Sequence, residues 1–108
     1  MKKKNNFVYR IFKSDEFEKF KNSNIFEGNE MDFESGFIHL STKEQLKQTI
    51  SNYFNNNDNL IIVQLRSSDL TDFLRWELST NNSKFPHFYN KLEYKWVNKV
   101  FSSSELCL

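Results

Sequence analysis

Three short blocks of the sequence hold nearly all the side chains that can carry acid–base or binding chemistry. They are residues 36–42, with the letters GFIHLST, residues 75–77, with RWE, and residues 85–89, with FPHFY. The two histidines of the chain, His39 and His87, lie in the first and third blocks. Because histidine changes its charge near neutral pH, either residue can serve as a general base or hold a ligand through a hydrogen bond.

A metal centre is a weaker interpretation of the same residues. Two imidazoles and one carboxylate, from His39, His87 and Glu77, are a ligand set that zinc or non-haem iron uses. However, no H-x-H or H-E-x-x-H spacing places two of these ligands on one element, so we predict no metal site. The single cysteine, Cys107, can form neither an internal disulfide nor a cysteine-rich zinc site, which favours a reducing cytoplasm.

Each reactive residue also has a purely structural interpretation, and both interpretations stay open. Glu77 and Arg75 lie on one face of a predicted strand, where they can form an ordinary surface ion pair. His39 can be a hydrogen-bonded residue of the core, and Tyr89 can pack its ring against a turn around Pro86.

The serine and threonine of the first block are also candidate helix caps. Ser41 with Glu44 and Thr42 with Gln45 both have the spacing of a capping box, ahead of an apolar helical pattern. An amphipathic helix is therefore predicted after the short strand at residues 36–40. Capping explains at least one of the two hydroxyls without any ligand.

The remaining periodicity predicts an α+β domain with two short helices and a mixed or antiparallel sheet. Ser14 is the predicted N-cap of the first helix, whose apolar face holds Phe17 and Phe20. Pro86 cannot donate a ladder hydrogen bond and so marks an edge or a loop. We predict strands at residues 7–12, 36–40, 60–65, 74–78 and 92–101, and turns at the asparagine-rich residues 55–59 and 81–83.

Length and charge narrow the class of protein. A chain of 108 residues forms one domain, which we place at residues 7–101, between a disordered basic tail at 1–6 and a C-terminal tail at 102–108. The net charge of +1 and the short Lys2–Lys4 run indicate no nucleic-acid partner, and no segment is apolar enough to span a membrane. The chain has only two glycines, too few for the glycine-rich phosphate-binding loops of the Walker and Rossmann types.

In the order and spacing of these blocks, the chain resembles a family of small, mostly bacterial proteins called domain of unknown function 952. The residues that carry the resemblance are GFIHLST with Gln45, the RWE block, FPHFY where the family has FPHLY, and the strand with Tyr9, Arg10 and Ile11. It extends from about Phe7 to Phe101. The resemblance implies an ADP-ribosyltransferase-like fold, with a split mixed or antiparallel sheet and a cleft that binds NAD in catalytic relatives.

The resemblance also implies roles for individual residues. Glu77 would be the catalytic carboxylate that stabilises an oxocarbenium-like ribose cation, with His39 as a general base. The ligand-binding residues would be Arg10, Ser41, Thr42, His87 and Tyr89. Arg75 stands two residues before Glu77, where relatives that modify arginine carry a second acid, so modification of protein arginines is not expected.

The implied function is therefore that of an NAD-dependent transferase, with NAD as the substrate and no other cofactor. Its reaction would be ADP-ribosyl transfer or cleavage of the glycosidic bond of NAD. The alternative is a non-catalytic module on the same fold that binds a nucleotide or a protein partner. The effect of Glu77→Gln on turnover separates the two.

Overall fold

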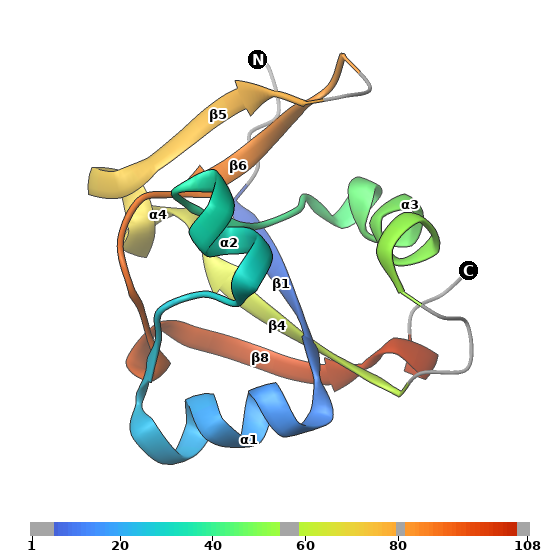
Figure 1. The fold of residues 1–108 in the computed structure, drawn as a ribbon, viewed down its shortest axis with the longest axis vertical. Coiled ribbons are helices and arrows are strands. Elements are labelled where there is room, and N and C mark those ends of the chain that lie inside the picture. The colour runs from blue at the N-terminus through green and yellow to red at the C-terminus, as the bar shows by residue number, and fades with distance from the viewer. Residues whose placement is uncertain (1–5, 55–58, 80–81, 106–108) are drawn as a thin grey trace.

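A computed structural model describes residues 6–54, 59–79 and 82–105 of the chain. The basic run Lys2–Lys4, Cys107, residues 55–58 of the first asparagine-rich turn and residue 81 of the second lie outside these ranges. The described chain has several antiparallel sheets and four short α-helices (Figure 1). None of its helices is long and apolar enough to cross a membrane.

The largest sheet consists of β1 (Phe7–Lys13), β4 (Leu60–Arg66) and β8 (Val97–Ser102), in the order β1-β4-β8. Both pairings are antiparallel, and β4 is the central strand. Its aliphatic residues are buried on both faces of the sheet, except that Ile61 is half-buried, in agreement with the continuous apolar run.

A second antiparallel sheet has the order β3-β6-β5, formed by β3 (Ile38–His39), β6 (Lys84–Phe88) and β5 (Leu74–Leu78). The prediction that Pro86 marks an edge or a loop is wrong, because β6 is the central strand. The carbonyl of Pro86 accepts a hydrogen bond from the N–H of Leu40 at 3.1 Å. In a strand, the N–H and C=O of one residue point toward the same neighbouring strand. The N–H that proline lacks would therefore point toward Leu40, one residue past the end of β3, where no ladder hydrogen bond of β3 is lost.

The predicted strand at residues 92–101 is two strands. The first part, β7 (Leu92–Glu93), pairs with β2 (Ile25–Phe26), whereas β8 pairs with β4. A single turn of 3₁₀ helix at Tyr94–Trp96 separates them. Apolar alternation continues through this turn, and for that reason periodicity alone does not show the break.

The number of helices also differs from the prediction. The predicted helices are α1 (Ser14–Ser23) and α3 (Lys43–Tyr53), and the structure adds α2 (Glu30–Ser35). Residues 67–69, whose composition predicts a turn or a one-turn helix, form the single turn α4 (Ser67–Leu70). Ser14 is the first helical residue rather than the N-cap. The cap position is held by Lys13, whose backbone N–H donates to Oε1 of Glu16 at 3.0 Å.

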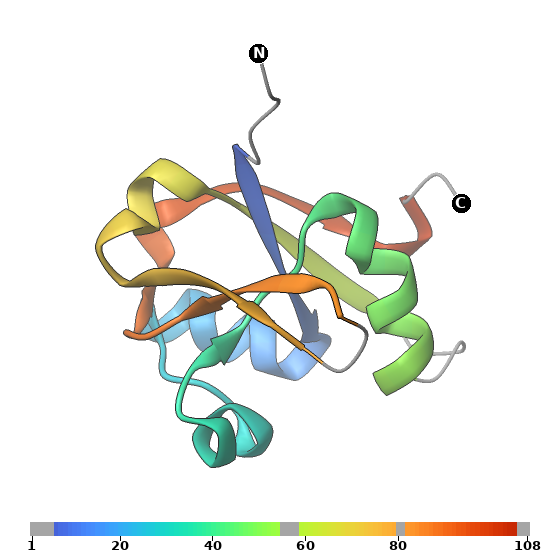
Figure 2. The ribbon, with the colours of Figure 1, turned by 90° about the horizontal axis from the view of Figure 1, so that it is seen from above.

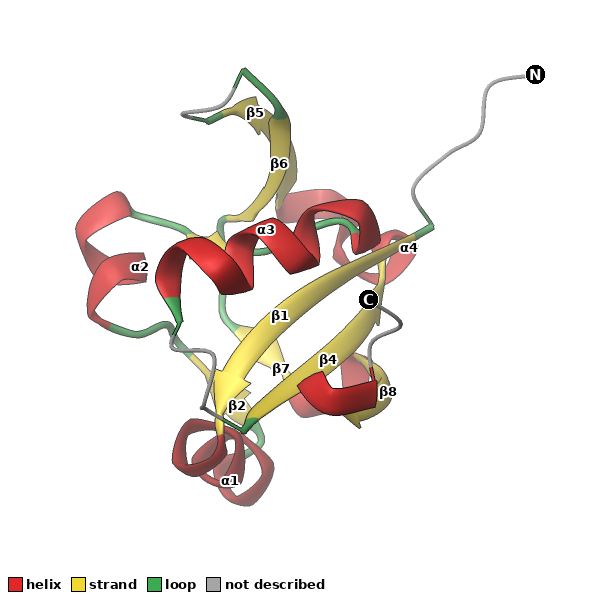
Figure 3. Ribbon diagram, turned by 90° about the vertical axis from the view of Figure 1, so that its right-hand side faces the viewer, coloured by secondary structure: helices red, strands yellow, loops and turns green. Residues whose placement is uncertain are grey.

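The core has two parts, one on each face of the β1–β4 sheet. Strand alternation sends Val8 and Phe12 toward α1, where Phe12 stacks on Phe20 at 5.4 Å between ring centroids. Tyr9 and Ile11 point the other way and pack with Leu46 of α3. Figure 3 shows α3 lying across β1, with the β5–β6 hairpin beyond it.

The two larger sheets meet at the edge strand β1. The N–H of Tyr9 donates to the carbonyl of Ser41 at 2.8 Å, and the N–H of Ser41 donates to the carbonyl of Tyr9 at 2.9 Å. The chain that leaves β3 therefore continues as a short partner of β1 before α3 begins. Seen from above, the β5–β6 hairpin crosses over β1, and α3 lies to one side of that strand (Figure 2). This junction brings the GFIHLST block beside Arg10.

Candidate functional site

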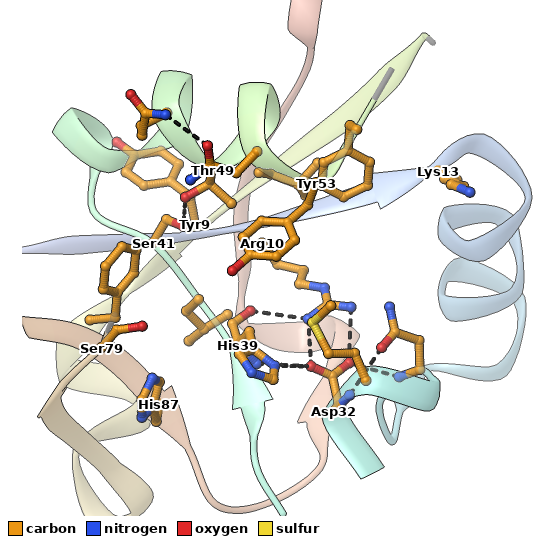
Figure 4. A pocket seen from close by; sticks show the side chains of 18 of the residues that line it. Tyr9, Arg10, Lys13, Asp32, His39, Ser41, Thr49, Tyr53, Ser79 and His87 are labelled. Carbon is orange, nitrogen blue, oxygen red and sulfur yellow. Dashed lines mark hydrogen bonds and ion pairs between the residues drawn. The ribbon is translucent and has the colours of Figure 1, made fainter. Parts of the chain in front are cut away.

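A cavity of about 330 Å³ lies where β1, α3 and the β3–β6 pair meet (Figure 4). Its volume is at the lower end of the range typical of pockets that bind small ligands. Four of the predicted site residues line it, and they come from three strands and the segment before α3: Arg10, His39, Ser41 and His87. Glu77, Thr42 and Tyr89 do not line this cavity.

One face of the β3-β6-β5 sheet carries most of the predicted site. His39 lies directly opposite His87, and His87 lies opposite Arg75 on its other side. Residues directly opposite in antiparallel strands share a face, as do residues two apart in one strand. Glu77 and Tyr89 therefore belong to the same face as the two histidines.

Asp32 of α2 is the main functional candidate that the sequence interpretation missed. It is 3% exposed, and its carboxylate accepts hydrogen bonds from Nη1 of Arg10 at 3.0 Å and from Nδ1 of His39 at 2.7 Å. Nη2 of Arg10 lies 3.0 Å from its second oxygen, and the backbone N–H groups of Asn29 and His39 also donate to it.

These contacts determine the charge of Asp32. Burial by itself would raise the pKa of the carboxyl, but the hydrogen bond from His39 and the positive charge of Arg10 outweigh it. The pKa of Asp32 is consequently held well below its ordinary value, and the group is an anion at neutral pH.

Two signals in the sequence point to α2, although neither identifies the partners of Asp32. Asn29 and Asp32 have capping-box spacing, and each side chain bonds the backbone N–H of the other. The only glycines of the chain, Gly28 and Gly36, flank the helix, both with positive φ. A Cβ on Gly28 would lie 2.8 Å from Cβ of Asp32, so this approach requires glycine.

Arg10 is buried among polar and aromatic partners. Besides its ion pair with Asp32, its Nη1 donates to the backbone carbonyl of His39 at 3.0 Å. The guanidinium carbon lies 4.8 Å from the ring centroid of Phe26 and 5.6 Å from that of Phe12, which is the geometry of cation–π contacts. The charge of Arg10 is thus already balanced inside the protein.

Glu77 has a hydrogen-bond network of its own at the edge of the cavity. Its Oε1 accepts from Nδ1 of His87 and from the hydroxyl of Tyr89, each at 2.7 Å. The Tyr89 hydrogen bond, followed by that of His87, lowers the pKa of Glu77, and the same bond to Glu77 raises the pKa of Tyr89. Arg75 forms no ion pair with Glu77, and its guanidinium carbon lies 5.3 Å from the ring centroid of Tyr89.

The two neighbouring hydroxyl groups of the GFIHLST block have different roles in the structure. Thr42 is the N-cap of α3: its Oγ1 accepts the N–H of Gln45 at 3.2 Å, and Oε1 of Gln45 accepts the N–H of Thr42 at 3.0 Å. Ser41 lines the cavity instead, with its Oγ 3.4 Å from Oγ1 of Thr49. Capping therefore explains Thr42, whereas Ser41 faces the space that a ligand would occupy.

The two histidines pack closely. Their ring centroids are 5.9 Å apart, and Phe37 stacks on His87 at 3.9 Å while also contacting His39. Each Nδ1 is held by a different carboxylate, Asp32 for His39 and Glu77 for His87. Among the residues that the structure describes, no group of three histidine, cysteine or acidic side chains could hold a metal ion.

The sequence and the fold have counterparts among known proteins. The family described as protein of unknown function (DUF952) matches residues 11–100, so the chain belongs to that family. The crystal structure of protein CC0527 from Caulobacter crescentus is similar, with 32% sequence identity and a TM-score of 0.83, over 89% of this chain and 84% of that one.

Two further structures of CC0527 agree with this comparison. The crystal structure of a double mutant gives the same values, and the solution NMR structure has a TM-score of 0.79 at 33% identity, over 88% of this chain and 82% of that one. A search of curated proteins found no match to the sequence. These comparisons establish the family of the chain. An activity has to be inferred from the residues of the cavity.

Proposed function

We propose that the cavity binds NAD or a related nucleotide and that the protein acts on its glycosidic bond, on an ADP-ribosyltransferase-like split sheet in the bacterial cytoplasm. The observation that carries this proposal is the junction of β1 with the segment after β3. It gathers His39, Ser41 and His87 on the wall of one cavity. The rings of Tyr53 and Phe85 on the same wall offer surfaces for a base or a nicotinamide ring.

Glu77 supports the catalytic part of the proposal. When the bond between C1′ of the ribose and the nicotinamide nitrogen breaks, its electron pair stays on the nitrogen and the sugar becomes a cation. The lowered pKa of Glu77 keeps its carboxylate ionised, which is the state that stabilises such a cation. His87, bonded to Glu77, lies on the cavity wall and joins the carboxylate to the bound ligand.

The acceptor completes the reaction. A water molecule or a hydroxyl group adds to C1′, and its proton passes to a neutral imidazole, for which His39 is the more exposed candidate. Arg10 has a different role from the one that the family resemblance implied. With its charge balanced by Asp32, it orients His39 through Asp32 and does not provide a free cation for a phosphate.

The test is release of nicotinamide from NAD by the purified protein, compared between Glu77→Gln and Glu18→Gln. The second variant makes the same chemical change at an exposed position of α1. We expect Glu77→Gln to lose turnover by about 10²-fold or more while NAD binding changes little, and Glu18→Gln to match the parent protein. Binding of NAD without release of nicotinamide in the parent would leave the non-catalytic module as the function.

A further inference from the structure

The cavity holds one more imidazole than cleavage of NAD requires. Nicotinamide leaves as a neutral molecule, because the nitrogen of the glycosidic bond is cationic before the bond breaks. A single base, to take the proton of the acceptor, completes that reaction. His39 and His87 nevertheless lie directly opposite each other in the β3–β6 register, and both line the cavity.

The hydrogen bonds of the two rings define which nitrogen is free. A carboxylate can only accept a hydrogen bond, so Nδ1 of His39 and Nδ1 of His87 both carry the proton, donated to Asp32 and Glu77 at 2.7 Å. Nε2 of each ring has no hydrogen-bond partner among the described residues. A neutral ring is therefore a base at Nε2, and a protonated ring is an acid at the same atom.

Two such rings on one wall supply a base and an acid together. A reaction needs both when its nucleophile must lose a proton and its leaving group must gain one. The transesterification of a ribonucleotide phosphodiester is such a reaction, because a 2′-hydroxyl attacks and an alkoxide leaves. The hydroxyl groups of Ser41 and Thr49, which lie 3.4 Å apart on the same cavity lining, can bond a ribose, and the exposed Lys13, which lines the other end of the cavity, can supply a cation for a phosphate.

We infer that His39 and His87 form an acid–base pair that cleaves a ribonucleotide phosphodiester bound in this cavity. One imidazole takes the proton of the 2′-hydroxyl as its oxygen bonds to phosphorus. The bond from phosphorus to the 5′-oxygen then breaks, and the other imidazole, which is protonated before the reaction, gives its proton to that oxygen, leaving a 2′,3′-cyclic phosphate. Asp32 and Glu77 are positioning residues that hold the rings. This inference rests on the nucleotide-binding part of the proposed function and not on cleavage of NAD.

The test uses the dinucleotide cytidylyl-3′,5′-adenosine, with phosphorus NMR to detect the cyclic phosphate. Its 2′-deoxy analogue is the chemical control, since it lacks the nucleophile. We expect cleavage of the ribose form alone, with rates lower by about 10²-fold or more in His39→Ala and in His87→Ala. Lys47→Ala, an exposed change on α3, is the protein control and should keep the full rate.

Chemical rescue separates catalysis from folding. Free imidazole added to His39→Ala should restore part of the rate, because it can occupy the emptied space, whereas a residue that only supports the fold gives no such recovery. Asp32→Asn should lower the rate with both rings still present. An amide spectrum of each variant confirms that it is folded.

Three results would overturn the inference. They are no cleavage of the ribose dinucleotide by the folded parent protein, cleavage that persists in both histidine variants, and cleavage of the deoxy analogue. The titration with NAD is independent of them. A protein that binds NAD but leaves the dinucleotide intact keeps the proposed function and loses the acid–base pair. A protein that cleaves the dinucleotide without releasing nicotinamide from NAD keeps the acid–base pair and loses cleavage of NAD.

Discussion

Arg10 and Asp32, 22 residues apart in the sequence, form a buried ion pair in which the two terminal guanidinium nitrogens, Nη1 and Nη2, each lie 3.0 Å from a carboxylate oxygen. The pair joins β1 to α2, and through His39 it also reaches β3. Taking two charges out of water is costly, and further hydrogen bonds to both partners offset that cost, although Nε of Arg10 is buried without a partner. It therefore fixes the ring of His39 in relation to the edge of the main sheet.

Removal of the charge of Asp32 should destabilise the protein strongly. In Asp32→Asn, Arg10 stays buried without a counter-ion, and loss of one partner of a buried pair costs about 3–5 kcal/mol. Urea unfolding measures this free energy. Asp69→Asn, the same change at an exposed position of α4, should stay within about 0.5 kcal/mol of the parent. Equal stability of the two variants would show that the ion pair contributes nothing.

Because the pKa of Asp32 is lowered, we expect the protein to lose stability in acid. The pKa of Asp32 is lower in the folded protein than its ordinary value of 3.8, so the unfolded chain binds a proton first as the pH falls. The ionised carboxylate of Asp32 makes its full contribution to the free energy of unfolding above pH 3.8, and this contribution decreases as the pH falls below that value. Unfolding free energies between pH 6 and pH 2.5 should therefore fall in the acid range for the parent and change less for Asp32→Asn. Parallel pH profiles would contradict the lowered pKa.

The bond between Tyr89 and Glu77 predicts a shift at each partner. In Tyr89→Phe the main hydrogen bond to Glu77 is lost, and the pKa of that carboxyl should rise toward its ordinary value of 4.5. Carbon NMR of the labelled glutamate side chains follows the change. Tyr53→Phe removes a hydroxyl that is not bonded to Glu77 and serves as the control. An unchanged pKa in Tyr89→Phe would show that the bond is not formed in solution.

The two hydroxyls before α3 should differ in their effect on stability. Thr42→Ala removes the N-cap and should cost about 1 kcal/mol, typical of a lost cap. Ser41→Ala removes only a long hydroxyl contact to Thr49 and should cost less, but it should weaken binding of a nucleotide. Thermal unfolding and a binding isotherm of both variants test this. A larger loss of stability in Ser41→Ala would reverse the assignment.

The sequence was sufficient for the elements with strong periodicity. β4 was expected because an unbroken aliphatic run between turns is typical of a buried strand, and α3 because its cap and apolar spacing agree. The break between β7 and β8 was missed because the 3₁₀ turn at Tyr94–Trp96 keeps the apolar alternation. Pro86 was misjudged because its neighbour β3 ends one residue earlier, which depends on tertiary structure.

The site was predictable in its residue types and less so in its contacts. The blocks around His39 and His87 identified the two rings, and the β3–β6 register explains why they meet. The sequence does not identify Asp32, because α2 has only six residues, too few for a periodic signal. Its partner Arg10 is also distant in the sequence. Long-range pairing of charges is not encoded in local spacing.

The most direct test of the proposed function is an amide-shift NMR titration of the labelled protein with NAD. We expect shifts that cluster at Arg10, at residues 39–41 and at His87, with smaller changes at Glu77, and with nicotinamide appearing in the same tube. Ser41→Ala should weaken the shifts, while Thr42→Ala should leave them unchanged. Absence of shifts at millimolar NAD, or shifts on the far side of the main sheet near α1, would contradict a nucleotide site in this cavity.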